Sequence, residues 1–251
     1  METNENKPTN SKQKTIVISV LLSVLIVFFV VLCVLTLTGA LGGFENAVYN
    51  FLVGAKNPVL TGFVRVFTFA GFFPLLIGVG LVLELIPRTR HKFGFQAVLA
   101  AGVGYLINYI FKVIFQRPRP ILNQIITATG FSFPSGHSAA AGAFFVTIII
   151  YIIFNAKDRR ISIPAIVLCT LMPIVVALSR VYLGVHYVTD TITGIVLGTI
   201  IAIIISLVLW ALLNRKLTRF PKVHRLLFGK SYEIIPSAGQ ISHTIERLDD
   251  E

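Results

Sequence analysis

The chain has 251 residues, of which 55% are hydrophobic and only 13% are charged, and its mean hydropathy is +0.82. A soluble domain would carry about twice this share of charged residues, so the composition indicates an integral membrane protein. The lysines and arginines behind the formal net charge of +11 lie mostly in short loops and in the C-terminal tail, with no nucleic-acid-binding motif beside them, so lipid rather than nucleic acid is the expected partner.

Six apolar stretches are long enough to be membrane-spanning helices. Residues 16–37 carry no charge over 22 residues, roughly 33 Å as a helix, which crosses a bilayer core and is too long for a signal peptide. The other five spans are expected at residues 59–86, 95–115, 138–154, 164–179 and 188–213. Pro164 is expected to open the fifth span and Pro173 to bend it. Gly194 and Gly198 predict close helix packing by the sixth.

A short amphipathic segment follows the first span. Its apolar residues recur at helical spacing, which predicts a helix lying on the membrane surface: Phe44, Val48, Phe51 and Leu52. The predicted fold is therefore all-α, a polytopic membrane protein of six transmembrane helices with a short interfacial helix between the first and second. We expect an N-terminal tail (1–15), a membrane domain (16–213) and a C-terminal tail (214–251) that is first basic and then acidic.

The lysine and arginine residues predict an orientation in the membrane. They concentrate in the two tails and in the loops after the second and fourth spans, so the positive-inside rule places both termini in the cytoplasm. Three polar segments then remain on the outer face, at residues 116–120 (QRPRP), 133–138 (FPSGHS) and 179–190 (SRVYLGVHYVTD). We expect them to form one site at the outer surface of the cell membrane.

The segment FPSGHS has the character of an anion site at the start of a helix. Pro134 ends the preceding structure, Ser135 is a good N-cap, and Gly136 lets the backbone approach a ligand closely. The first turn of a helix offers unpaired N–H groups and the positive end of the helix dipole. His137 would face a ligand bound there.

Several cations are predicted beside this anion site. Lys112 shares a helix face with Tyr105 and Asn108, and the run Arg-Pro-Arg-Pro holds Arg117 and Arg119 in an extended segment. Ionisable groups within a span are costly and usually functional; the open alternative is that Lys112 only extends to the interface. Fixed cations favour a multivalent anion, and the planar fork of arginine matches phosphate.

The third segment supplies a histidine and an aspartate four residues apart. If His186 lies in the first turn of the sixth span, Asp190 can accept a hydrogen bond from one imidazole nitrogen. That bond would fix the tautomer and leave the other nitrogen free as a nucleophile or base. A purely structural His–Asp pair at a helix start is the open alternative. Arg180, at the end of the fifth span, adds another cation.

Metal ligands are scarce in the membrane domain. Its acids are Glu45, Glu84, Asp158 and Asp190, too few on the outer side for a two-metal phosphatase site. Neither a metal nor a cofactor is therefore expected.

Together the three segments resemble the signature of the type 2 phosphatidic acid phosphatase superfamily. Every position is filled by Lys112-x6-Arg119-Pro120, Pro134-Ser135-Gly136-His137 and Ser179-Arg180-x5-His186-x3-Asp190. The resemblance implies that His186 attacks phosphorus to form a phosphohistidine, that Asp190 orients it, and that His137 protonates the leaving oxygen. It also implies a set of phosphate-binding residues: Lys112, Arg119, Ser135, Gly136 and Arg180. Arg117 lies outside the signature as a supporting charge.

The resemblance implies a membrane lipid phosphatase of the bacterial plasma membrane. The substrate would be a lipid phosphomonoester or diphosphate, such as undecaprenyl diphosphate, phosphatidylglycerophosphate or phosphatidic acid. One alternative is a phosphotransferase that uses a lipid or sugar acceptor, and another is a non-enzymatic anion transporter. The expected partners are this lipid and the bilayer, and the sequence predicts no particular oligomeric state.

Overall fold

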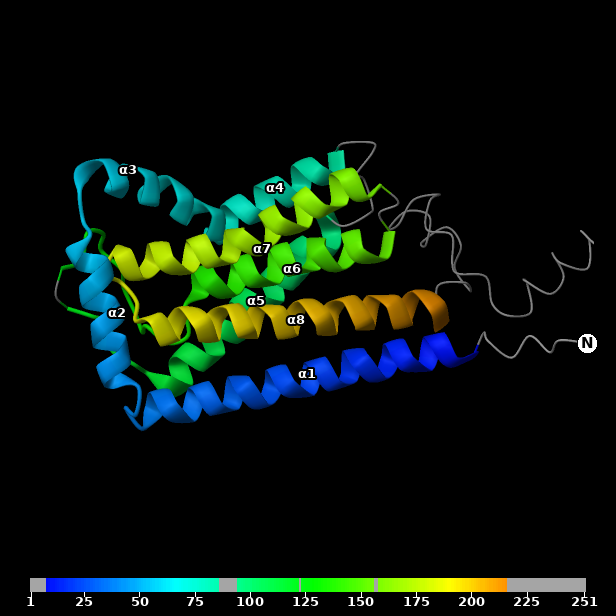
Figure 1. Cartoon of the computed structure of the whole chain (residues 1–251), viewed down its shortest axis with the longest axis horizontal. Coiled ribbons are helices and arrows are strands. Elements are labelled where there is room, and N and C mark those ends of the chain that lie inside the picture. The colour runs from blue at the N-terminus through cyan, green and yellow to red at the C-terminus, as the bar shows by residue number, and fades with distance from the viewer. Residues whose placement is uncertain (1–7, 86–93, 122, 156–157, 216–251) are drawn as a thin grey trace, which may run out of the picture.

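The computed structural model describes residues 8–85, 94–121, 123–155 and 158–215, and these residues form helices and no strand (Figure 1). The prediction of an all-α fold is confirmed. The helices are α1 (Pro8–Leu37), α2 (Gly42–Gly54), α3 (Pro58–Phe67), η1 (Thr68–Gly71), α4 (Phe73–Leu85), α5 (Gly94–Phe115), α6 (Gly136–Asn155), α7 (Arg159–Tyr182) and α8 (Val188–Arg215). Residues 1–7, the basic loop 86–93 and the predicted tail from 216 onward lie outside the described residues.

Five of the described helices are long and apolar enough to cross a membrane, namely α1, α5, α6, α7 and α8. The sequence predicted one further continuous span at 59–86, but here the chain is broken into α3 with η1 and α4, which are bent by 63°. Phe72 between them is extended, and Pro74 has no N–H with which to continue a helix through this point. The count is six only if this bent pair makes one crossing.

The fifth predicted span also starts earlier than expected. Asp158 caps α7, because its side chain accepts a 2.8 Å hydrogen bond from the N–H of Arg160. Pro164 therefore lies inside the helix rather than at its start, and Pro173 lies inside it as well. The capping aspartate outweighed the proline because a proline near a helix start removes few intrahelical hydrogen bonds.

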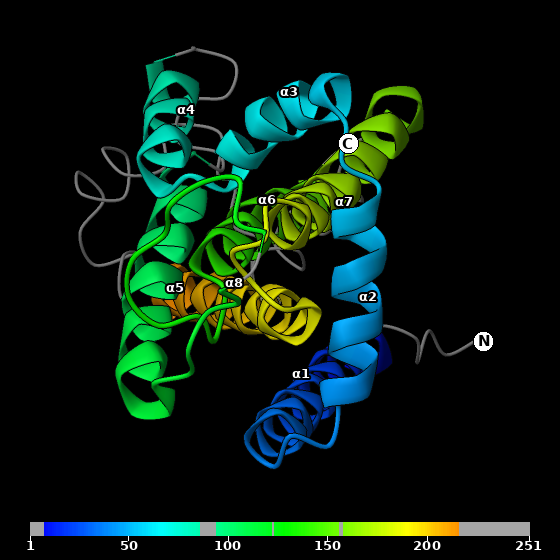
Figure 2. The same cartoon turned by 90° about the vertical axis from the view of Figure 1, so that its left-hand side faces the viewer.

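Helix α6 lies at the centre of the bundle, in contact with α5, α7 and α8 (Figures 1 and 2). Its alanines are fully buried, and small residues of α8 face it, as the sequence predicted for Gly194 and Gly198. A Cβ added to Gly198 would lie 2.3 Å from the carbonyl oxygen of Ala139, and one added to Gly194 would lie 2.6 Å from that of Ser135. Backbone contact at these two glycines brings the starts of α6 and α8 together.

We expect Gly198→Ala to destabilise the protein by about 1–3 kcal/mol, because the new methyl group would push α6 and α8 apart. Thermal unfolding in detergent micelles measures the effect. Gly78→Ala is the matched control, since a Cβ at this position in α4 meets no atom within 4 Å. Equal melting temperatures for the two variants would contradict this account of the α6–α8 contact.

Helix α2 crosses one end of the bundle, where α1 ends and α8 begins (Figure 1). Its buried residues, Glu45 and Tyr49, are four apart and so share one face, and α2 contacts α7 and α8. The N-terminal end of α1 and the C-terminal end of α8 lie at the opposite end of the bundle. The end that α2 covers holds the candidate active site.

Candidate active site

The three polar segments predicted to converge do meet at this end of the bundle. The loop after α5 is joined to the turn after α7 by a 3.0 Å hydrogen bond from the N–H of Ile125 to the carbonyl of Leu183. The start of α6 is joined to the first turn of α8, where the N–H of Ser135 donates to the carbonyl of Asp190 at 2.9 Å. Backbone contacts thus fix the relative positions of all three segments.

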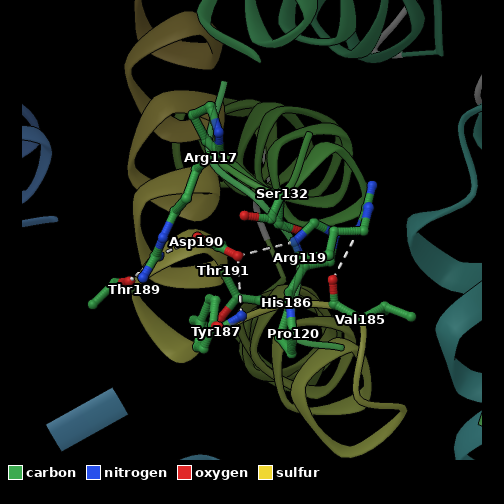
Figure 3. Close-up of polar contacts among 12 residues, drawn as sticks. Arg117, Arg119, Pro120, Ser132, Val185, His186, Tyr187, Thr189, Asp190 and Thr191 are labelled. Carbon is green, nitrogen blue, oxygen red and sulfur yellow. Dashed lines mark hydrogen bonds and ion pairs between the residues drawn. The ribbon is translucent and has the colours of Figure 1, made fainter. Parts of the chain in front are cut away.

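His186 and Asp190 form a buried pair (Figure 3). The carboxylate accepts, so the His186 Nδ1–H donates to Asp190 Oδ2 at 3.2 Å, and neither side chain is more than 2% exposed. His186 lies two residues before α8 begins, so it does not meet the condition of lying in the first helical turn. The pair forms nonetheless, because Asp190 also accepts the N–H of Tyr187 at 3.0 Å, as in a capping box.

The second nitrogen of His186 faces Arg119. With the proton on Nδ1, His186 Nε2 accepts from Arg119 Nη1 at 3.0 Å. Burial lowers the pKa of His186 well below its ordinary value, against the raising effect of Asp190, so the imidazole is neutral at pH 7. The unprotonated Nε2 is therefore the nitrogen available to a ligand.

Arg119 also donates hydrogen bonds to backbone carbonyls of the loop after α5 and of the turn that carries His186. Its Nε donates to the carbonyl of Gly130 at 3.0 Å, its Nη2 to that of Thr129 at 3.1 Å, and its Nη1 to that of Val185 at 2.9 Å. Burial lowers the pKa of Arg119, and Asp190 opposes this. Arg119 therefore joins the loop after α5 to the turn that carries His186.

Arg180 is a buried arginine whose hydrogen bonds are incomplete. The side chain is 5% exposed, and its Nη1 donates to Thr68 Oγ1 at 3.1 Å. Its Nε is buried and has no hydrogen-bond partner among the described residues. An unpaired buried donor on a cation is costly, and an anion in the pocket would satisfy it.

Lys112 is held by backbone carbonyls of the loop before α6. Its Nζ donates to the carbonyls of Phe131 and Ser132, at 2.6 and 3.1 Å. The charges of Arg119, Asp190 and Arg180 all act on it. Lys112 thus lies within range of the other cations, as the sequence predicted.

The segment FPSGHS forms the start of α6, with Ser135 as its cap. Ser135 Oγ accepts from the N–H and the hydroxyl of Ser138, at 3.4 and 3.0 Å, which leaves its own O–H free to donate. The Nδ2 of Asn108 donates to the carbonyl of Pro134 at 3.1 Å, and a Cβ on Gly136 would lie 3.2 Å from Asn108 Oδ1. Asn108 therefore holds this turn in place.

His137 occupies the first turn of α6 beside the aromatic ring of Phe72, with ring centroids 6.3 Å apart. Within the described part of the chain, its imidazole has no hydrogen-bond partner. The charges of Arg180, Arg119 and Lys112 act on it, as does His186. A ligand among these cations would therefore lie near both histidines.

The structure adds one side chain that sequence reasoning did not assign to the site, Glu45, and it shows that Arg117, predicted as a supporting charge, forms two ion pairs. Arg117 Nη1 lies 2.6 Å from Asp190 Oδ1, and its Nη2 lies 2.6 Å from Glu45 Oε2. Burial lowers the pKa of Arg117, but these two carboxylates outweigh burial and raise it overall. The available signal was Glu45 itself, an acid four residues before Tyr49 on the buried face of an apolar helix.

No group of three or more His, Cys, Asp and Glu side chains within the described ranges is arranged to hold a metal ion. Two histidines, one close aspartate and four basic side chains dominate the site instead. Such a set can bind a phosphate group and offer a neutral imidazole to it.

Comparisons with known proteins agree with this chemistry. The family model described as PAP2 superfamily matches residues 93–214. Phosphatidylglycerophosphatase B of Bacillus subtilis (strain 168) is 28% identical over 178 residues, which is 68% of this chain and 85% of that protein. The region that the family model matches, residues 93–214, contains the whole signature from Lys112 to Asp190.

Two solved structures share the fold. One is a transmembrane PAP2 type phosphatidylglycerolphosphate phosphatase from Bacillus subtilis, which superposes with a TM-score of 0.65 at 26% identity, over 74% of this chain and 94% of that one. Aquifex aeolicus LpxE superposes with a TM-score of 0.50 at 24% identity, over 64% of this chain and 93% of that one. The second likeness concerns the fold alone.

Proposed function

The chain belongs to the PAP2 superfamily, and from that premise we propose that it is a phosphatase of membrane lipids which acts through a phosphohistidine. The observation that carries this proposal is the placement of His186 between Asp190, at 3.2 Å from Nδ1, and Arg119, at 3.0 Å from Nε2. That arrangement gives a neutral imidazole with a fixed tautomer beside a cationic cluster.

In the first step, His186 Nε2 attacks the phosphorus atom of the lipid phosphate. The N–P bond forms while the P–O bond to the lipid breaks, and His137 gives its proton to the departing oxygen. The imidazole becomes positively charged as it is phosphorylated, and Asp190 stabilises that charge through Nδ1–H. Donors around the phosphoryl oxygens stabilise the transition state: Lys112, Arg119, Arg180, the Ser135 hydroxyl and the Gly136 N–H.

In the second step, water attacks the phosphohistidine. His137, now neutral, takes a proton from this water, and the N–P bond breaks to release inorganic phosphate and restore His186. Both histidines return to their starting protonation states, so the cycle needs no external acid or base.

The substrate we propose is a lipid whose phosphate reaches the covered end of the bundle while its tail stays in the bilayer. Phosphatidylglycerophosphate is the first candidate, because the relative from Bacillus subtilis is named a phosphatidylglycerophosphatase. Phosphatidic acid and undecaprenyl diphosphate offer the same phosphate chemistry. By the positive-inside rule, the site would face the outer side of the cell membrane and both termini the cytoplasm.

A panel assay tests the proposed function. The purified protein in detergent micelles is given each of the three lipids, and both free phosphate and phosphorylated acceptors are measured, with His186→Ala as the blank. Release of free phosphate from at least one lipid is the expected result. Transfer to a lipid or sugar acceptor would indicate a phosphotransferase, and the absence of both products would contradict an enzymatic role.

We expect activity to survive EDTA and to be inhibited by vanadate. The cations Lys112, Arg119 and Arg180 supply positive charge at the phosphate, and vanadate adopts the five-coordinate geometry of the transition state. Phosphate release with and without each reagent gives the measurement. Activity that is lost on chelation and restored by a divalent ion would contradict the mechanism.

A further inference from the structure

We propose that Glu45 is a positioning residue that acts on the nucleophile His186 through Arg117 and Asp190. The inference rests on the proposed function and assigns a role in it to helix α2. It depends on a continuous series of contacts that begins on α2 and ends at the imidazole.

Two ion pairs of equal length carry the series. Glu45 Oε2 and Asp190 Oδ1 each lie 2.6 Å from a different Nη of Arg117. The Asp190 side chain is fully buried, that of Glu45 is 6% exposed and that of Arg117 is 18% exposed. Solvent screening is therefore weak, and loss of one of the three side chains leaves a buried charge on the others without its ion-pair partner.

Arg117 has little freedom to move in this arrangement (Figure 3). Its Nη1 donates to Thr189 Oγ1 at 3.0 Å as well as to Asp190, and its guanidinium carbon lies 4.3 Å from the centre of the Tyr187 ring. Glu45 accepts a hydrogen bond from Arg117 Nη2 and another from the hydroxyl of Thr189. With both ends of the guanidinium fixed, Nη1 stays directed at Asp190 Oδ1.

The two oxygens of Asp190 have different tasks. Oδ2 accepts from His186 Nδ1 and from the N–H of Tyr187, while Oδ1 accepts from Arg117. Arg117 therefore stops the carboxylate from rotating, and the carboxylate in turn fixes the imidazole. A nucleophile displaced by about 1 Å can lose up to about 100-fold in rate.

The charge of Glu45 matters as much as its contacts. His186 becomes positively charged when it is phosphorylated, and Asp190 stabilises that charge. Arg117 alone would cancel the negative charge of Asp190, whereas the trio with Glu45 keeps a net charge of about −1 beside the imidazole. Glu45 thus permits Arg117 to hold the carboxylate without removing its electrostatic effect.

A merely structural role for Glu45 would be to attach α2 to the bundle. Tyr49 already contributes to that attachment, since it packs with Val181 and Val188 and its ring lies 6.3 Å from that of Tyr187. The two roles make different predictions: an anchor affects stability, and a positioning residue affects kcat in a protein that remains folded.

The test is Glu45→Gln, which keeps the shape of the side chain and removes its charge. We expect kcat for phosphate release to fall about 10- to 100-fold with KM unchanged, because Glu45 does not touch the substrate and is separated from His186 by two side chains, Arg117 and Asp190. Glu45→Asp should recover part of the loss. Asp158→Asn is the matched control, since it removes one acid at the far end of α7 while keeping a good N-cap, and its kcat should equal that of the wild type.

A double-mutant cycle identifies the route of the effect. In an Arg117→Gln background, Glu45→Gln should change kcat far less than it does alone, because the contact through which it acts is gone. If Glu45→Gln lowered kcat by the same factor in the wild-type and Arg117→Gln backgrounds, the proposal would be overturned. An unchanged kcat in a folded Glu45→Gln variant would overturn it as well.

Folding is measured by thermal unfolding of every variant. If Glu45→Gln does not fold, the double variant Glu45→Gln/Arg117→Gln, which removes the buried pair together, takes its place. A wild-type kcat in that variant would overturn the proposal. A wild-type protein that hydrolyses no lipid phosphate would instead contradict the proposed function, which separates the two failures.

Discussion

Replacing His186 by alanine is expected to abolish phosphate release, with a fall in kcat of at least about 10⁴-fold. The imidazole is the proposed nucleophile, and it is buried and held from both sides, by Asp190 at Nδ1 and by Arg119 at Nε2. Without the imidazole no phosphohistidine can form, so both steps of the proposed mechanism are lost. Steady-state phosphate release measures the loss of turnover. Acid-labile labelling of the protein from a ³²P-labelled lipid measures the loss of the phosphohistidine.

His137→Ala separates the nucleophile from the acid. With a soluble aryl phosphate, whose leaving group needs no proton, this variant should still form the phosphohistidine and should then accumulate it, since no base assists the water. His186→Ala should show neither a burst nor a label with the same substrate. A labelled His186→Ala protein would move the nucleophile to another residue and would contradict the mechanism.

The second large effect is expected for Arg180→Lys, a fall in kcat/KM of about 10²- to 10³-fold. The buried Nε of Arg180 has no protein partner among the described residues, while Nη1 is held by Thr68 at 3.1 Å. A lysine keeps the charge but has one nitrogen, which cannot reach Thr68 and also donate from the position of Nε. The melting temperature should change little, because the arginine already carries an unpaired buried donor.

Arg65→Lys is the matched control for this prediction. Arg65 lies in the last turn of α3 and is exposed. It should keep wild-type kinetics on the same lipid. If Arg180→Lys also kept them, the unpaired Nε would not be a phosphate ligand and the proposed pocket would need a different cation.

Helix content and the polar segments that form the candidate site were predictable because they depend on local patterns. A run of about 20 apolar residues forms a helix in lipid whatever its neighbours are, and a capping serine before a helix is a signal of a few residues. The spans ending at Phe115 and beginning at Val188 were placed to within a residue for this reason. The signature from Lys112 to Asp190 is equally local within each of its three segments.

Other features required distances that no local pattern contains. Hydropathy alone could not locate the 63° bend after Gly71, since both halves of the broken helix are apolar. The position of His186 in a turn rather than in α8 depends on Asp190 capping that helix from inside. The start of α7 was likewise predicted at Pro164, although the helix begins at Arg159, directly after the capping residue Asp158.

By itself the sequence determined an all-helical membrane protein and predicted the three polar segments that meet at one end of the bundle, because hydrophobic length and signature spacing act over short stretches of chain. Only the tertiary structure decided which side chains hold Asp190 and, through it, the proposed nucleophile. Glu45 and Arg117 are 72 residues apart, and Arg117 and Asp190 are separated by 73. Their ion pairs exist because α2 crosses the bundle end where α8 begins, and buried charges are stable only where folding brings such partners together.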